Sequence, residues 1–98
     1  MNEQLHILIV EDNPADVDLI HELILKTGFV QFRIESVARL SDAIARIAIG
    51  EIDLIITDLG LPDSRGLETF YSINKAAPNL AIIVLTIAHD QEMAITAV

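Results

Sequence analysis

The chain reads IDLIITDLGLPDSRG over residues 52–66. The first six residues of this stretch predict a buried strand, and the glycines, proline and polar residues that follow Asp58 predict a loop. Asp58 is therefore expected at the end of a strand, on an open sheet edge. An apolar run over 6–10 ends in the same way, at Glu11 and Asp12. If the two strands are parallel neighbours, three carboxylates meet at one edge and must bind a cation or share protons.

The composition limits the class of protein. The 98 residues are 52% hydrophobic and 4% aromatic, so the core must consist of Ile, Leu, Val and Ala, as in buried parallel strands. This excludes a disordered chain, and the length indicates one domain over residues 1–98. Six basic residues against fifteen acidic ones give a net charge of −9, without a basic cluster for nucleic acid. The lack of cysteine excludes thiolate metal sites and fits the cytoplasm, and the apolar runs are too short to span a membrane.

Short apolar runs alternate with stretches of helical periodicity, which is typical of repeated βα units. The first helix is expected to have Asn13 as its N-cap, Pro14 as its first residue and Gly28 at its C′ position. Gly50 and Pro78 are expected to end the next two helices. The expected strands cover residues 6–10, 32–37, 52–57 and 80–86, with 32–37 as an outer strand, and the later helices cover 40–48, 67–76 and 89–98.

Right-handed crossovers place the loop after each strand at the carboxyl edge of the sheet. Glu11, Asp12, Asp58 and Thr86 are thus predicted at one edge. Two unit charges about 4 Å apart repel by roughly 4 kcal/mol at an effective dielectric near 20, which a hard divalent cation would offset. Mg²⁺ fits best, because it prefers oxygen ligands and commonly works beside phosphoryl groups.

Three segments, in this order, resemble the receiver domain of two-component response regulators and hybrid sensor histidine kinases. They read ILIVEDNP over 7–14, DLGLPDSRGLE over 58–68 and IIVLT over 82–86. The resemblance covers the whole chain and implies a three-layer, flavodoxin-like α/β fold with a parallel sheet of strand order 2-1-3-4. By this resemblance the chain ends about one βα unit early, before the family's fifth strand and helix.

The resemblance also implies a role for each site residue. Asp58 is similar to the phosphoacceptor, which takes a phosphoryl group from a histidine kinase or phosphotransfer domain. Glu11, Asp12, Asp58 and the Gly60 carbonyl resemble the Mg²⁺ site, with Asp12 as a direct ligand and Glu11 acting mostly through water. Thr86 is similar to the switch hydroxyl that changes the surface formed by the fourth strand and fourth helix. Such a domain is a signalling phosphoacceptor that promotes only its own phosphorylation, not an enzyme.

Two departures from the family pattern leave other functions open. The family's lysine and aromatic switch residue belong to the fifth strand and cannot be assigned here, and Ile87 stands where the family usually has Ala or Gly. A β-branched side chain there could crowd the phosphoryl group. The alternative is a phosphorylation-impaired interaction or dimerisation module with a receiver fold. A haloacid-type phosphatase ranks last, because it needs a second Asp where this chain has Gly60.

The strand predicted over 80–86 would be an apolar edge without a partner if no further strand follows. Such edges recruit strands from other chains. We therefore expect a homo-oligomer, formed edge to edge through this strand or by a swap of the terminal helix.

Overall fold

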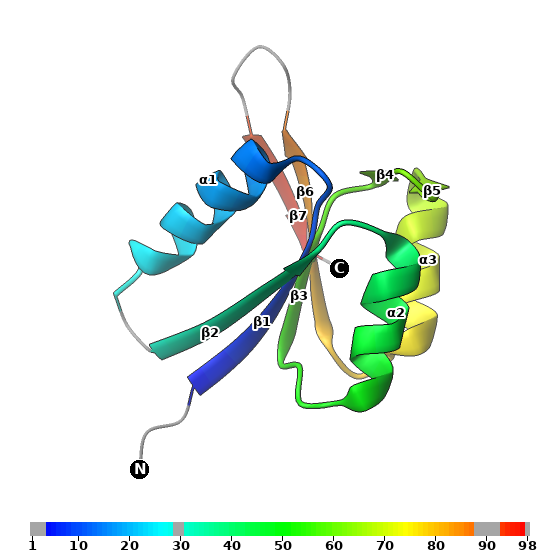
Figure 1. Ribbon diagram of the computed structural model, residues 1–98, viewed down its shortest axis with the longest axis horizontal. Helices are drawn as coiled ribbons and strands as arrows, with labels where there is room; N and C mark the ends of the chain where they lie inside the picture. Colours follow the sequence, from blue (N-terminus) through cyan, green and yellow to red (C-terminus); the bar gives the residue numbers. More distant parts are fainter. Residues whose placement is uncertain (1–3, 29–30, 88–92, 98) are drawn as a thin grey trace.

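A five-stranded sheet with helices on both faces forms the molecule (Figure 1). The computed structural model describes residues 4–28, 31–87 and 93–97, with the backbone alone from Thr86 onward. The sheet order is β2-β1-β3-β6-β7. The strands are β1 (Gln4–Val10), β2 (Gln31–Val37), β3 (Leu54–Thr57), β6 (Ala81–Ile87) and β7 (Met93–Ala97). The neighbours β2, β1, β3 and β6 are parallel. This confirms the predicted order 2-1-3-4 and the outer position of β2.

The helices form the two outer layers. Figure 1 shows α1 (Pro14–Leu25) on one face of the sheet and α2 (Leu40–Ile49) and α3 (Leu67–Ala76) on the other. This arrangement confirms the three-layer, flavodoxin-like fold. With 10 or 12 residues each, these helices are too short to cross a membrane, and none of the described helices is long and apolar enough to do so.

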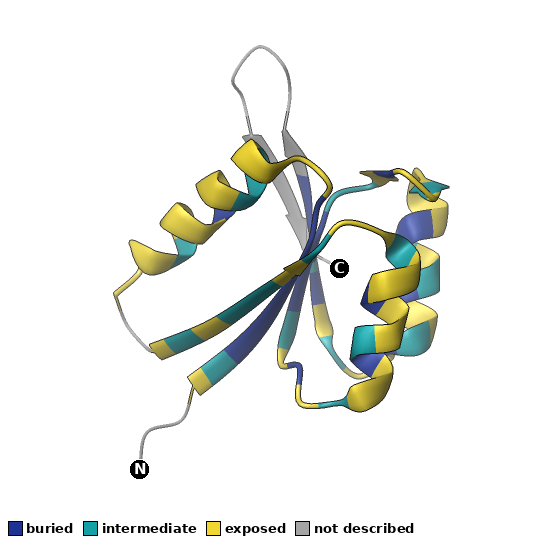
Figure 2. Ribbon diagram, viewed as in Figure 1, coloured by how far each residue is buried: buried dark blue, intermediate teal, exposed yellow. Residues whose placement is uncertain are grey.

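Two apolar cores lie on opposite faces of the same strands, because successive side chains of a strand point to opposite sides. Leu8 of β1 packs in the core under α2 and α3, with Ala43 and Ile73. Its neighbour Ile9 packs in the core under α1, with Ile20. The central strands are buried along most of their length in Figure 2, as expected for a sheet covered on both faces.

The helix boundaries follow the predicted signals with one exception. Asn13 Oδ1 accepts a hydrogen bond from Ala15 N at 2.9 Å, which confirms the N-cap of α1. The prediction of Gly28 at the C′ position is wrong by one residue, because the helix ends at Leu25 with Lys26 as its C-cap, and Gly28 (φ 65°) follows the C′ residue Thr27. Both the N–H and the hydroxyl of Thr27 bond to Ile24 O, at 3.1 and 2.9 Å, and close the last turn early. Gly50 (φ 95°) and the non-helical residue before Pro78 end α2 and α3 as predicted.

The predicted helix over 89–98 is wrong where the structure describes it. Met93–Ala97 forms β7, antiparallel to β6, with Thr86 opposite Ala94. The open edge of β6 offers backbone N–H and C=O groups that need partners, and this pairing outweighs the weak helical periodicity of a segment with β-branched residues. Residues 88–92 lie outside the described residues.

The pairing of β7 with β6 also bears on the expected self-association, which was argued from an unpaired edge strand. The edge over 80–86 was predicted to have no partner, and this is wrong because β6 pairs with β7 inside the chain. Self-association itself stays a prediction.

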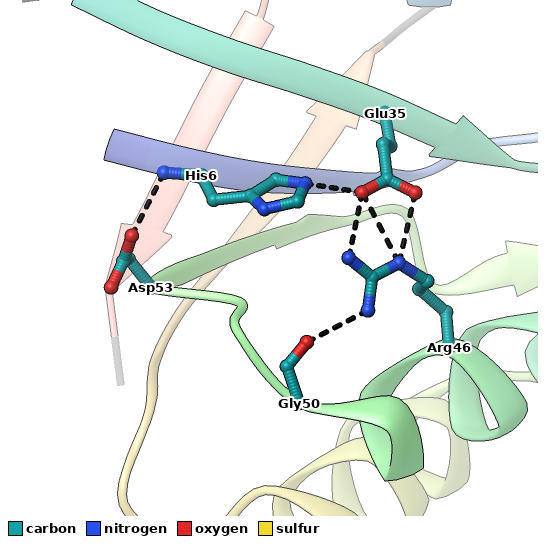
Figure 3. A network of polar contacts seen from close by, with 5 residues as sticks. All are labelled: His6, Glu35, Arg46, Gly50 and Asp53. Atoms are coloured by element: carbon teal, nitrogen blue, oxygen red, sulfur yellow. Dashed lines mark hydrogen bonds and ion pairs between the residues drawn. The ribbon is translucent and has the colours of Figure 1, made fainter. Parts of the chain in front are cut away.

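A polar network joins β1, β2 and α2 beneath the helix layer (Figure 3). The buried His6 contacts the carboxylate of Glu35 through Nε2. Arg46 donates from Nε and Nη2 to Glu35 at 2.9 to 3.1 Å and from Nη1 to Gly50 O at 2.8 Å. The guanidinium of Arg46, with a smaller contribution from His6, lowers the pKa of Glu35 from its ordinary value of 4.5 to about 2. Glu35 is thus held as an anion.

Candidate functional site

The acidic residues follow directly from the ends of two paired strands. Val10 and Thr57 lie opposite each other in the ladder between β1 and β3. The ladder continues for one bond more, since Asp58 N donates to Val10 O at 3.0 Å. On the other side of β1, Glu11 N donates to Val37 O at 3.0 Å. Backbone pairing therefore sets where Glu11 and Asp58 leave the sheet.

Glu11, Asp12 and Asp58 form one group, which we call the acid cluster. One carboxylate oxygen from each residue lies within 4.8 Å of those from the other two. Glu11 is buried, Asp58 is half-buried and Asp12 is exposed. The predicted meeting of these three side chains at one sheet edge is confirmed.

Burial makes the charge of the cluster costly. The pKa of Glu11 is raised from its ordinary value of 4.5 to about 8, mainly by burial and with smaller contributions from the carboxylates of Asp12 and Asp58, against a hydrogen bond from Asn13 N at 3.1 Å that lowers it. A divalent cation would offset this repulsion. The donor set consists of carboxylate oxygens alone, which are the ligands that a hard cation such as Mg²⁺ prefers.

The loop after β3 orients the carboxylate of Asp58. Its Oδ1 accepts hydrogen bonds from Leu59 N at 2.7 Å and from Gly60 N at 3.3 Å. Within the described part of the chain, Oδ2 receives no hydrogen bond. Two backbone N–H groups thus fix one oxygen of Asp58 and leave the other open to a cation or a reacting group.

Gly60 and Thr86 lie near this edge, but their predicted roles are not tested. Gly60 belongs to the short strand β4 (Gly60–Leu61), which pairs with β5 (Ser64–Arg65) in a hairpin that the sequence did not indicate. Thr86 belongs to β6, two residues beyond Val84, which pairs with Thr57. The side chain of Thr86 lies outside the described residues, so its switch role stays a prediction.

Comparison with known proteins identifies the family. The model of the response regulator receiver domain matches residues 7–98. This chain belongs to the receiver domain family of response regulators. The receiver domain is a signalling domain of two-component systems, and the resemblance stated from the sequence is confirmed.

Curated relatives of this receiver domain are longer regulators. The glycerol metabolism activator of Pseudomonas putida is 27% identical over 93 residues, which are 94% of this chain and 42% of the relative. The swarming motility regulation protein RssB of Serratia marcescens is 34% identical over 82 residues, which are 84% of this chain and 36% of the relative. The receiver domain thus spans less than half the length of these relatives.

Solved structures of receiver domains share the fold. The MaeR response regulator bound to beryllium trifluoride has a TM-score of 0.73 and 27% identity, over 91% of this chain and 70% of that one. The non-phosphorylated HemR receiver domain from Leptospira biflexa has a TM-score of 0.68 and 27% identity, over 86% and 65% of the two chains.

Proposed function

We propose that this receiver domain accepts a phosphoryl group on Asp58, as part of a two-component phosphorelay. The observation that carries the proposal is the acid cluster, with one oxygen of Asp58 held by two backbone N–H groups and the other open. Phosphoryl transfer needs little covalent chemistry from the protein beyond in-line positioning and neutralisation of charge. The cluster has the residues for both tasks.

The transfer forms one bond to phosphorus and breaks another. A carboxylate oxygen of Asp58 attacks phosphorus and forms a new O–P bond, while the P–N bond of a histidine phosphate breaks. The electron pair of that bond leaves with the imidazole nitrogen, which then takes a proton. The product on this domain is an acyl phosphate.

Other groups of the site would assist this step. Glu11, Asp12, Asp58 and the Gly60 carbonyl would hold Mg²⁺, with Asp12 as a direct ligand and Glu11 acting mostly through water. When bound, the ion neutralises charge on the phosphoryl oxygens. The hydroxyl of Thr86 would then bond to the new phosphoryl group and bias the surface after β6 toward a second state.

The setting of the domain is part of the same proposal. The phosphoryl donor would be a histidine kinase or a phosphotransfer domain, in the cytoplasm. Residues 1–98 would act as one domain. The cluster of acids and the net charge of −9 argue against nucleic acid as a partner of this segment.

Intact mass spectrometry after incubation with acetyl phosphate and Mg²⁺ tests the proposal. The wild type should gain the mass of one phosphoryl group, and Asp58→Asn should gain none. Asp42→Asn, which removes an exposed carboxylate of α2, is the matched control and should gain the group as the wild type does. A wild-type protein that gains no phosphoryl group would contradict the proposed phosphoacceptor function.

The alternative, a phosphorylation-impaired interaction or dimerisation module with a receiver fold and no working switch, has one observation in its favour. The backbone of Thr86 and Ile87 pairs with β7, opposite Ala94 and Met93, so a move of this segment must break that ladder. Beryllium trifluoride, with which the MaeR response regulator was solved, separates the two functions. A switching domain should show amide chemical-shift changes in β6 and β7 when it is added with Mg²⁺. Changes confined to the acid cluster would favour the alternative.

A further inference from the structure

The N-terminus of α2 has no capping side chain of its own. Arg39 occupies the N-cap position with extended backbone (φ −132°, ψ 151°) and, within the described residues, makes no side-chain capping hydrogen bond. A guanidinium group only donates, so it cannot satisfy the free N–H groups of a first helical turn. These groups bond either to water or to an acceptor from elsewhere in the chain.

Asp63 supplies this acceptor from the loop over residues 59–66, which we call the 59–66 loop. Its Oδ1 accepts from Leu40 N at 2.8 Å, and its Oδ2 accepts from Ser41 N at 3.0 Å. These two bonds, from Ser41 and from Leu40, lower the pKa of Asp63 and keep it ionised. Both oxygens of one carboxylate thus join the loop to α2, across 22 and 23 positions of sequence.

The 59–66 loop is joined to α3 as well. The fully buried Thr69 donates from Oγ1 to Leu59 O at 3.0 Å. The Ser64 hydroxyl lies 2.7 Å from Thr69 Oγ1 and must donate to it, because the single hydrogen of Thr69 is already used. Two helices therefore fix a loop that also contains the β4–β5 hairpin.

The same loop supplies the groups that orient Asp58. Leu59 N and Gly60 N, which donate to Asp58 Oδ1, lie four and three residues before Asp63. We propose that Asp63 is a positioning residue of the phosphoacceptor site: by joining the 59–66 loop to α2, it holds Leu59 and Gly60 against Asp58. This inference rests on the proposed function and names a residue on which that function depends.

A pair of variants separates positioning from simple helix capping. Asp63→Ala removes both the cap of α2 and the attachment of the loop. Adding Arg39→Ser to it restores a cap, because serine at an extended N-cap accepts from the first turn, but it does not restore the attachment. Asp42→Ala is the matched control, since it removes an exposed carboxylate from the first turn of α2 without touching the loop.

Mg²⁺ affinity by isothermal titration calorimetry is the first measurement. Both Asp63 variants should bind Mg²⁺ about tenfold more weakly than the wild type, the lower end of what residues that orient metal ligands contribute. The double variant should recover the stability that Asp63→Ala loses, and Asp42→Ala should bind as the wild type does. A double variant with wild-type Mg²⁺ affinity would reduce Asp63 to a helix cap and overturn the proposal.

Amide hydrogen exchange at Leu59 and Gly60 gives a second measurement, without metal. The double variant should exchange these two amides faster than the wild type, and unchanged exchange would contradict the proposal. A wild type that binds no Mg²⁺ would refute the proposed function instead, and the exchange rates alone would then decide the role of Asp63.

Discussion

At the scale of single residues, Gly60 and Gly66 differ although they belong to the same 59–66 loop. Gly60 has no positive φ, and a Cβ added there meets no described atom within 4 Å. Gly66 is the N-cap of α3 with φ 65° and ψ −152°, a backbone region that side chains rarely adopt. Gly60 contributes to the site through its backbone. At Gly66, by contrast, the backbone conformation itself requires a residue without a side chain.

Alanine at the two positions should separate these requirements. Gly66→Ala should destabilise the fold by about 1–3 kcal/mol through backbone strain. Gly60→Ala should change stability by no more than about 0.5 kcal/mol, as an exposed substitution without contacts does, and leave phosphorylation of Asp58 intact. Urea unfolding and intact mass measure the two effects. Loss of phosphorylation in Gly60→Ala would mean that a side chain there blocks the site.

The acid cluster could be predicted from the sequence, but the hydrogen bonds around it could not. Glu11, Asp12 and Asp58 each follow an apolar run, and parallel pairing brings the ends of such runs together. Asp63 bonds to residues 22 and 23 positions earlier, and this depends on how α2 lies against the loop. An aspartate after proline indicated only a turn.

At the scale of elements, the contact of Glu35 with Arg46 joins β2 to α2 and should make stability depend on pH. The pKa of Glu35 is lowered from 4.5 to about 2 in the folded protein, so folding favours the anion. The stabilisation is fully present above about pH 4.5 and is lost as the pH falls toward 2. With a side chain that is 34% exposed, Glu35 contributes at most about 1 kcal/mol, as ion pairs open to solvent do.

Glu35→Gln should therefore be less stable than the wild type at neutral pH, and the difference should shrink as the pH falls below 4.5. Denaturant unfolding at a series of pH values measures it. Glu22→Gln, which changes an exposed side chain of α1, controls for the loss of one negative charge. A difference between Glu35→Gln and wild type that stays constant down to pH 2 would contradict the lowered pKa.

The boundaries of elements were predictable where local chemistry decides them. Asn13 and Pro14 begin α1, and Gly50 ends α2, because capping and left-handed backbone are properties of single residues. The strand Met93–Ala97 was not predictable, since it depends on the partner that β6 offers, which the segment's own residues do not reveal. Tertiary pairing outweighed local periodicity there.

At the scale of the whole molecule, the two faces of the sheet are covered unequally. The face under α2 and α3 buries Leu8 completely. On the face under α1, an apolar groove of about 310 Å³ lies between the helix and the strands, and its lining includes Ile20, Leu23, Ile56 and Leu85. Leu23 remains 42% exposed there. Among the described residues, α1 is the one helix on this face, and it leaves the face partly open to solvent.

A leucine-to-alanine substitution on each face tests this difference in burial through the loss of stability that it causes. Leu8→Ala leaves a cavity in a closed core and should cost about 2–5 kcal/mol. Leu23→Ala removes a side chain that is 42% exposed, and about half of the usual burial energy, roughly 1 kcal/mol, should be lost. Urea unfolding of the two variants gives both values under the same conditions. Equal losses would show that the groove is closed in solution, by a second copy of the chain or by rearrangement of α1. Light scattering at the same protein concentrations distinguishes these two, because only a second copy doubles the mass.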